Sequence, residues 1–208
     1  QKKKRKRTDL TDAISLSKQA AAAASSSSLS SSSSSSSSNN NGKTKNRLLK
    51  DEEKTMYVGL DCEMVGVGST GKTSVLARAC LVDYDGEVIY DKFVRPQEFV
   101  TDFRTKWSGV RKENFRKNEG AITLRQCQNE VAALLADKYL VGHALKNDLS
   151  VLLLSHKRSM IRDTATYRPY MKPHARKAGK FKPRALRDLT QQFLDYQIQG
   201  GEHDPSED

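Results

Sequence analysis

The chain of 208 residues carries 36 Lys/Arg against 25 Asp/Glu, and this net charge of +11 favours a polyanionic partner such as nucleic acid. The length allows one domain with an appendage, and no apolar run approaches the ~20 residues of a membrane helix, so we expect no membrane association. Three widely spaced cysteines without a C-x-x-C pair argue against a disulfide framework or a zinc site and indicate a reducing compartment.

The first 54 residues differ in composition from the rest. Residues 1–50 hold 11 Lys/Arg and 2 Asp, which is +9 of the net charge. The run KKKRKR at residues 2–7 is typical of a nuclear import signal or an RNA-phosphate contact, although a solvated charge run has the same composition. Residues 20–41 are Ala, Ser and Asn interrupted only by Leu29, and cannot bury enough apolar surface to offset their ordering entropy. We therefore predict a disordered basic tail over residues 1–54 and a folded domain over 55–208.

The folded region begins with strands and continues with alternating strands and helices. Apolar and β-branched runs predict strands at residues 56–65, 75–82 and 88–94, and the Asp-Gly turn signal in DYDGE favours an antiparallel meander. Helical spacing of apolar residues then predicts a helix at 123–137, a second around 145–152 and a third around 185–193. Short strands are expected at 139–144 and 159–164. This order implies an α/β fold, a mixed sheet with helices on both faces.

The stretch GVGSTGKT at residues 66–73 matches the phosphate-loop pattern G-x-x-x-x-G-K-[ST] at every fixed position. A phosphate loop needs a helix that begins at its Lys-Thr, because the helix N-terminus supplies the N–H groups that bind phosphate. The following residues, SVLARACLV, lack a helical apolar stripe and run into another strand. We therefore predict a hairpin loop here, in which Lys72 is a candidate contact for a nucleic-acid backbone.

Asp61 and Glu63 form a D-x-E inside the apolar run YVGLDCEMV. Residues two apart in a strand point to the same face, so the two carboxylates share one face. Neighbouring anions in a half-buried strand repel each other and lose hydration, which a divalent cation would offset. Hard oxygen ligands suit Mg²⁺ or Mn²⁺. A solvent-facing edge strand explains the same pattern, and this segment alone favours neither interpretation.

Asp148 lies in the second predicted helix, three residues after Leu145 and four before Leu152. It is therefore on the helix face that packs inward. A buried acid needs a partner, and a metal ion shared with Asp61 is one candidate; an Asp at the edge of the apolar stripe is the alternative. His143, at the strand-to-helix junction, is interpreted as a hydrogen-bonding structural residue rather than a metal ligand.

The C-terminal sequence GGEHDPSED predicts the start of a helix. Asp204 suits the N-cap, Pro205 the first helical position and Glu207 the third, as in a capping box. His203 precedes this helix on a loop, where it is a candidate general base toward water if a carboxylate–metal cluster lies beside it. An ordinary surface histidine is the alternative. The chain ends at Asp208, and we expect the helix to be cut short there.

Together these stretches resemble the DEDDh 3′→5′ exonuclease superfamily, and within it the group of interferon-stimulated exonucleases and related RNA exonucleases. The matching stretches cover most of residues 56–208: LDCEMVGVG, LARACLV, YDKFVRP, FRTKWSGV, LVGHALKNDL, IRDT and GEHDPSED. The resemblance implies a ribonuclease-H-like fold, a mixed sheet flanked by helices. It departs at HDPSED, where members usually have HSSVEDA and continue for a full helix beyond the last Asp.

The resemblance assigns catalytic roles to five residues: Asp61, Glu63, Asp148, His203 and Asp208. It implies that the four acids hold two divalent metal ions, Mg²⁺ or Mn²⁺, and that His203 activates water. The expected activity is 3′→5′ exonuclease hydrolysis of single-stranded RNA to nucleoside 5′-monophosphates, in ribosomal RNA maturation in the nucleus and nucleolus. A monomer acting on pre-ribosomal RNA and particles is expected. A catalytically weak RNA-binding assembly factor and a phosphate-loop nucleotidase are the alternatives.

Residues 164–187 are predicted to bind the substrate, because they hold eight Lys/Arg and no acid, with three aromatic rings interleaved. Cations for phosphates and rings for bases suit single-stranded nucleic acid, although a solvated basic loop has the same composition. The single tryptophan, Trp107, is expected in the core rather than as a stacking platform. The full set of predicted RNA contacts is Met64, Lys72, His143, Leu145, Arg168, Lys172, Arg176, Lys177, Lys180 and Lys182.

Overall fold

The computed structural model describes residues 49–116, 120–200 and 205–206, which belong to a compact unit spanning Arg47–Asp208. The predictions made for the basic run, for the disordered tail up to residue 48 and for His203, Asp204, Glu207 and Asp208 lie outside these residues. The boundary between tail and domain at residues 54 and 55 stays a prediction. A short helix that the sequence did not predict, α2 (Asp51–Lys54), precedes the first strand.

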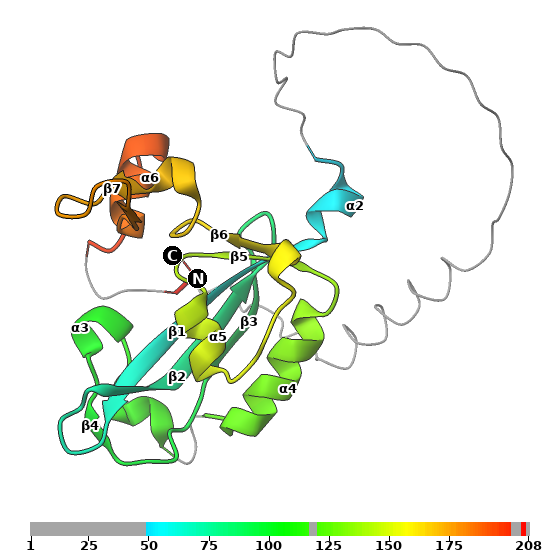
Figure 1. Ribbon diagram of the computed structural model, residues 1–208. Helices are drawn as coiled ribbons and strands as arrows, with labels where there is room; N and C mark the ends of the chain where they lie inside the picture. The colour runs from blue at the N-terminus through cyan, green and yellow to red at the C-terminus, as the bar shows by residue number, and fades with distance from the viewer. Residues whose placement is uncertain (1–48, 117–119, 201–204, 207–208) are drawn as a thin grey trace, which may run out of the picture. The chain divides into compact units, whose positions relative to one another are not determined.

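A mixed sheet forms the centre of this unit (Figure 1). Its strands are β1 (Tyr57–Val67), β2 (Thr73–Val82), β3 (Val88–Phe93), β4 (Val100–Asp102), β5 (Tyr139–Gly142) and β6 (Ile161–Asp163). Their order is β3-β2-β1-β5-β6, and β4 also pairs with β1. The first three strands are antiparallel neighbours, whereas β1, β5 and β6 run parallel. The predicted mixed sheet and its opening meander are therefore confirmed, and β4 is an addition to the prediction.

Three longer helices lie where apolar spacing predicted them: α4 (Leu124–Leu135), α5 (Lys146–Val151) and α6 (Leu186–Leu194). The Thr123 hydroxyl caps α4 by accepting a hydrogen bond from Gln126 N at 3.2 Å. The shorter elements are α3 (Thr105–Ser108), the 3₁₀ turns η1 (Lys112–Phe115), η2 (Arg158–Met160) and η3 (Arg168–Tyr170), and the hairpin strands β7 (Lys172–Pro173) and β8 (Phe181–Lys182). Within the described ranges, no helix combines the length and apolar character needed to cross a membrane.

The two faces of β1 contact different hydrophobic clusters, as the alternation of a strand requires. Val58, Leu60 and Cys62 pack with apolar residues of α4 and α5. Val65, on the opposite face, packs with Val110 and Phe103 from the segment that contains α3 and η1. The sheet is therefore covered on both faces, as predicted, and Cys62, Cys80 and Cys127 are buried free thiols.

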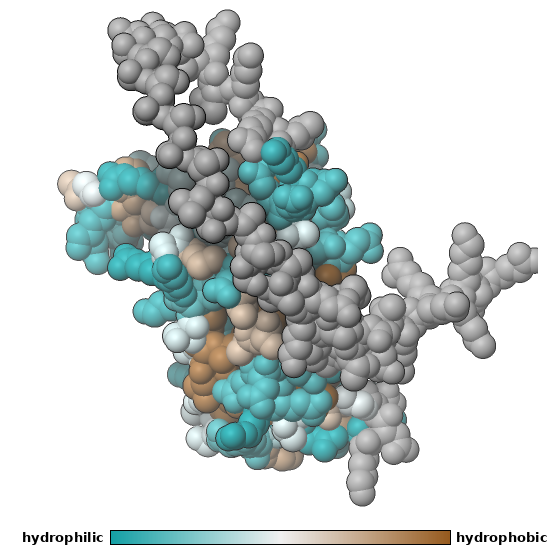
Figure 2. All heavy atoms as spheres, turned by 90° about the vertical axis from the view of Figure 1, so that its right-hand side faces the viewer, coloured by the Kyte–Doolittle hydropathy of each residue, from teal (hydrophilic) through white to brown (hydrophobic). Residues whose placement is uncertain are grey.

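Outside these clusters, the described surface is mixed. The view in Figure 2 shows mainly hydrophilic side chains, with separate apolar patches between them.

The phosphate-loop match forms the turn of the β1–β2 hairpin. Strand β1 ends at Val67 and β2 begins at Thr73, so no helix follows the Lys-Thr pair and the predicted hairpin is confirmed. A side chain on Gly66 would collide with the Gly71 carbonyl oxygen, which explains a glycine at this position. The spacing of the two glycines thus serves a tight turn and not a phosphate cradle.

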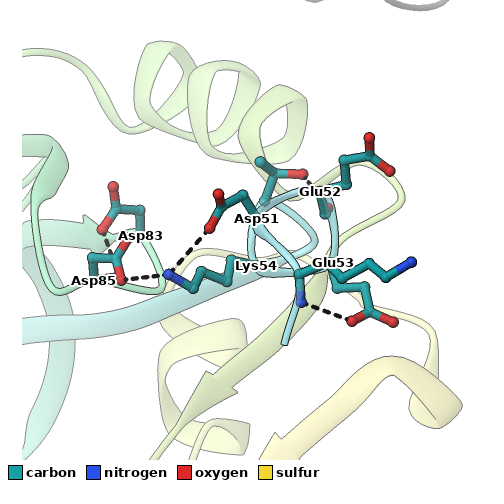
Figure 3. Close-up of polar contacts among 8 residues, drawn as sticks. Asp51, Glu52, Glu53, Lys54, Asp83 and Asp85 are labelled. Carbon is teal, nitrogen blue, oxygen red and sulfur yellow. Dashed lines mark hydrogen bonds and ion pairs between the residues drawn. The ribbon is translucent and has the colours of Figure 1, made fainter. Parts of the chain in front are cut away.

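Helix α2 is tied to the turn that follows β2 (Figure 3). Lys54 Nζ lies 3.4 Å from Asp51 Oδ1 and 3.5 Å from Asp85 Oδ1. In the turn itself, Asp83 Oδ1 accepts hydrogen bonds from the backbone N–H groups of Asp85 and Glu87 at 3.0 and 2.9 Å. These bonds fix the turn that the DYDGE sequence predicted.

Candidate active site

Asp61 and Glu63 lie on the central strand of the sheet, between β2 and β5. Glu63 is buried, with 7% of its surface exposed, and Asp61 is half-buried. Their spacing places both on the face that also carries Val65. The interpretation of the D-x-E as the wet side of an edge strand is therefore wrong, because β1 is an internal strand of the sheet and Glu63 is buried.

Asp148 reaches β1 through a gap in the sheet. Strand β5 pairs with β1 only at residues 57–59, and β4 only at Gly66 and Val67. Between these two pairings the Cys62 N–H donates a hydrogen bond to Asp148 Oδ1 at 3.1 Å. The Asp148 side chain is 3% exposed, so the prediction that it faces inward is confirmed. A third carboxylate is thus bonded to the residue that separates Asp61 from Glu63.

The charges at this point perturb one another. The pKa of Asp148 is raised from 3.8 to about 6, chiefly by burial and to a smaller extent by the charge of Asp163, against the lowering effect of its hydrogen bonds. Burial likewise raises the pKa of the Cys62 thiol, and the negative charges of Asp148 and Asp61 add to the effect. Both carboxylates therefore act on the same thiol. Concentrated negative charge with little access to water favours the binding of a cation.

The donor atoms of the three described acids have the chemistry that a hard divalent cation prefers. Asp61, Glu63 and Asp148 offer only carboxylate oxygens, which Mg²⁺ and Mn²⁺ prefer. Glu63 and Asp148 are also the buried acids of the described residues, and a buried charge requires compensation. Within residues 49–116, 120–200 and 205–206, however, no three His, Cys, Asp or Glu side chains form a group able to hold a metal ion, so Asp61, Glu63 and Asp148 do not by themselves assemble the predicted metal cluster. The fourth predicted ligand, Asp208, and the predicted base, His203, lie outside those residues.

A cavity of about 770 Å³ opens beside Asp61. Its lining includes Tyr57 and Gly59 of β1 and Cys80 of β2, next to Asp61. Pro205 and Ser206, the two described residues between His203 and Asp208, line the same cavity. Pro205 and Ser206 therefore lie at the same cavity as Asp61.

The connection from β5 to α5 is held by Asp163, which the sequence analysis did not single out. Asp163 Oδ1 accepts hydrogen bonds from Ala144 N at 2.8 Å and Ala165 N at 2.9 Å. Ala144 has a left-handed backbone, with φ of 57°. The sequence contained one signal for the role of Asp163, which is its position as a polar residue at the end of β6. Parallel strands β5 and β6 end at the same sheet edge, so a side chain there can reach the connection after β5. Asp163 thereby fixes the start of the helix that carries Asp148.

His143 lies in the same connection and forms a side-chain hydrogen bond. Its Nδ1 is 2.9 Å from Thr164 Oγ1, which donates to the Gly142 carbonyl at 3.1 Å. The interpretation of His143 as a hydrogen-bonding residue is confirmed. Its role in binding RNA stays a prediction.

The other predicted RNA contacts fall into two groups. The basic residues are exposed on the β1–β2 turn and around the β7–β8 hairpin: Lys72, Arg168, Lys172, Arg176, Lys177, Lys180 and Lys182. Arg168 stacks over the Phe181 ring at 4.1 Å. Leu145, by contrast, is 1% exposed in the core, and Met64 packs against the same cluster. RNA contacts by these two residues stay predictions that their burial does not support.

The expectation that Trp107 lies in the core is wrong, because 60% of its surface is exposed. It sits in the single turn of α3, which is followed by Gly109 in a left-handed conformation, with φ of 61°. In this turn Ser108 points inward and is 2% exposed. The general tendency of large aromatic residues toward burial misled the prediction, since the local turn decides which side chain faces the core.

The chain matches the family described as exonuclease over residues 58–208. Similar curated proteins are the RNA exonuclease 4 of Mycosarcoma maydis, 48% identical over 76% of this chain and 40% of the relative, and that of Saccharomyces cerevisiae, 44% identical over 76% and 53%. The human RNA exonuclease 4 is 46% identical over 72% of this chain and 33% of the relative. The chain thus spans between a third and about half of the length of these curated relatives.

Solved structures of Pan2 have a similar fold. The Saccharomyces cerevisiae Pan2 pseudoubiquitin hydrolase–RNA exonuclease module in complex with AAGGA RNA has a TM-score of 0.63 and 25% identity, over 81% of this chain and 30% of that chain. The Neurospora crassa Pan2 catalytic unit has a TM-score of 0.62 and 22% identity, over 83% and 29%. The family match covers the carboxylates of β1 and α5 and the C-terminal motif alike, so this chain belongs to the exonuclease family.

Proposed function

We propose that this protein is a metal-dependent 3′→5′ exoribonuclease that releases nucleoside 5′-monophosphates from single-stranded RNA. The observation that carries the proposal is the 3.1 Å hydrogen bond from Cys62 N to Asp148 Oδ1, which brings a third carboxylate to the residue between Asp61 and Glu63. Membership of the exonuclease family supports the reaction class. The RNA exonuclease 4 relatives and the Pan2 module solved with RNA support the substrate class.

Asp61, Glu63, Asp148 and Asp208 would hold two divalent cations, Mg²⁺ or Mn²⁺. Such ions, when bound, supply Lewis-acid stabilisation of the negative charge on the entering and leaving oxygens. The protein contributes carboxylates whose positions are set by the central strand and by the hydrogen bond between Cys62 and Asp148. Low exposure of Glu63 and Asp148 limits competition from water for their oxygens.

His203 is the proposed general base. It takes a proton from the water molecule that attacks the terminal phosphorus. The bond that breaks joins this phosphorus to the 3′ oxygen of the preceding nucleotide. The products are a nucleoside 5′-monophosphate and an RNA one nucleotide shorter, with a 3′-hydroxyl end.

The proposed setting is ribosomal RNA processing in the nucleus and nucleolus, by a monomer acting on pre-ribosomal RNA. The run KKKRKR and the +9 charge of residues 1–50 support a nuclear, polyanion-rich location. The exposed basic residues of the β7–β8 hairpin support a single-stranded substrate. Fluorescent tagging of the chain with and without residues 2–7 tests the location.

The activity test uses 5′-labelled single-stranded RNA with Mg²⁺, comparing the wild type with Asp61→Ala. We expect a ladder of products shortened from the 3′ end with the wild type only, and nucleoside 5′-monophosphates as the released product. A circular RNA of the same sequence is the matched substrate control and should stay intact, because it has no 3′ end. RNA binding without any shortening would replace the proposal by the RNA-binding assembly factor.

A further inference from the structure

We propose that Trp107 is a stacking platform for a base of the single-stranded RNA. The inference rests on the proposed function and adds a binding surface to the carboxylate site. Trp107 is the single tryptophan of the chain and is 60% exposed, on a short turn that leaves its ring in water. A single exposed apolar side chain is ordinary on a protein surface, so the proposal depends on how this ring is supported and on which residues surround it.

The turn that carries Trp107 is rigid. Ser108 Oγ donates to the Phe103 carbonyl at 2.8 Å and accepts from Val110 N at 3.1 Å. Thr105 Oγ1 donates to the Val110 carbonyl at 2.7 Å. Hydrogen bonds on both sides of Trp107 therefore close the turn, and Val110, which takes part in two of them, is fully buried. A ring held on such a support loses little conformational entropy when a base stacks on it.

The turn lies on the sheet face that carries the predicted catalytic acids. Asp61, Glu63 and Val65 share one face of β1, because they are two residues apart. Val65 packs with Val110 and Phe103, the residues at either end of the Trp107 turn. The segment with Trp107 therefore borders the carboxylates along the strand. An RNA strand that extends from the carboxylates along this face would pass the segment that carries Trp107.

The surroundings of Trp107 are cationic. Lys106 Nζ lies 5.9 Å from the indole ring. Arg104 ties the turn to the β1–β2 hairpin, donating to the Gly71 carbonyl and to Ser74 Oγ at 2.8 Å each, which brings the exposed Lys72 to the same surface. Arg111 and Lys112 are exposed just beyond the turn, and the nearby Glu113 pairs with Arg116 at 3.4 Å. An aromatic ring with cations around it can stack on a base while the cations bind the neighbouring phosphates. The positive charge therefore favours RNA over an apolar protein partner.

A single tryptophan makes the test direct, because all indole fluorescence of the chain comes from Trp107. The full chain is titrated in EDTA, which prevents cleavage, with an eight-nucleotide single-stranded RNA. Saturable quenching of the fluorescence is expected, since stacking on a base quenches indole. The matched probe is an oligomer of equal length and charge in which abasic riboses replace the nucleosides. It should bind through its phosphates, as measured by anisotropy, with little quenching.

Three variants separate stacking from other effects. Trp107→Ala should weaken RNA binding by roughly tenfold, in the range of base–aromatic stacking, and Trp107→Phe should restore most of the affinity. Phe99→Ala is the matched control, because Phe99 is 86% exposed beside Glu98 and its loss should leave affinity unchanged. The wild-type titration keeps the test valid even if a variant folds poorly.

The outcomes separate this inference from the proposed activity. If RNA binds without quenching and Trp107→Ala keeps wild-type affinity, the platform is overturned. A product ladder from the same protein would still support the nuclease. Quenching by RNA without a ladder upholds the platform while the nuclease fails. Equal quenching by the abasic oligomer also overturns base stacking, and quenching only by a protein partner assigns the surface to that partner instead.

Discussion

Asp148 shows how one residue couples the stability of this fold to its chemistry. The residue is 3% exposed, and its carboxylate accepts a hydrogen bond from Cys62 N, which satisfies a backbone donor in the gap between β4 and β5. Burial raises its pKa from 3.8 to about 6. Near neutral pH the protein without divalent ions therefore keeps a buried charge at this position. This buried negative charge favours the binding of a cation.

The pH dependence of stability follows from that shift. The folded state holds the Asp148 proton more tightly than the unfolded chain does, so its contribution is complete below pH 3.8 and is lost as the pH rises to about 6. Asp148→Asn removes the charge but keeps an oxygen acceptor. In EDTA it should raise the free energy of unfolding by roughly 2–3 kcal/mol at pH 7.5, and hardly change it near pH 4. Urea unfolding at both pH values checks this, with Glu98→Gln as control. A larger gain at pH 4 would contradict the shift.

A divalent cation should favour the wild type over Asp148→Asn, which is the opposite of the order of stability expected in EDTA. The proposed function requires Mg²⁺ or Mn²⁺ to bind the folded state, so adding either ion should raise the melting temperature of the wild type. Asp148→Asn and Glu63→Gln should show a much smaller rise, since each removes one buried carboxylate. Differential scanning fluorimetry over a range of Mg²⁺ concentrations measures this without any substrate. Equal rises in wild type and variants would exclude these acids as ligands.

At the scale of elements, the connection between β5 and α5 decides where Asp148 lies. One carboxylate oxygen of Asp163 binds two backbone N–H groups, and Ala144 between the two elements has a left-handed backbone. Strand β5 and helix α5 set the direction of the chain before and after the loop, whereas the Asp163 side chain fixes the backbone of the loop between them. The site therefore depends on a residue that need not contact the substrate.

Asp163→Ala should lower the free energy of unfolding by about 3 kcal/mol, because it removes two charge-assisted hydrogen bonds. RNA shortening should fall as well, since Asp148 is no longer held in a fixed position. Asp163→Asn keeps an oxygen at the same place and should lower both quantities less. Chemical unfolding and the ladder assay, run on the two variants in parallel, check this. Equal behaviour of the two variants would show that the oxygen acceptor is not what matters.

The β7–β8 hairpin is the second element with a separable role. Lys172, Lys177, Lys180 and Lys182 are exposed, and changing all four to Gln should weaken RNA binding most at low salt. The slope of log affinity against log salt should fall by about 0.7 for each RNA phosphate that the variant no longer neutralises. Changing the same four residues to Arg preserves charge and serves as the control. An unchanged slope in the Gln variant would place the substrate elsewhere.

At the scale of the whole molecule, charge and fold are carried by different parts of the chain. Residues 1–46 hold nine Lys/Arg and two Asp, whereas the compact unit begins at Arg47. Long-range attraction to RNA should therefore come largely from residues outside the unit that contains the sheet.

Removing residues 1–46 should leave the melting temperature nearly unchanged. It should weaken RNA binding severalfold at low ionic strength, and the difference from the full chain should shrink as salt screens the charges. Binding isotherms at two salt concentrations, with thermal unfolding as the control, measure both effects. A large fall in melting temperature would show that the N-terminal residues stabilise the folded unit.

Elements with strong periodicity were predicted well, and elements set by local turns were not. The apolar spacing of Leu124, Cys127, Val131 and Leu134 located α4, and alternation along β1 located its two faces. Strand β4 and the hairpin β7–β8 are two or three residues long, too short for a periodic signal. Trp107 was misplaced because its orientation depends on the hydrogen bonds of Ser108 and Thr105 around it.

Short-range rules of chain geometry were enough to predict the order of strands and helices, the hairpin in place of a phosphate loop, and the shared face of Asp61 and Glu63. These rules act between neighbouring residues, so the amino-acid pattern carries them directly. The assembled sheet was needed to learn that β1 is central, that Asp148 enters the gap between β4 and β5 to meet Cys62, and that Asp163 holds the loop before it. Such contacts join residues up to 86 positions apart, so they depend on how the sheet assembles and not on any local pattern.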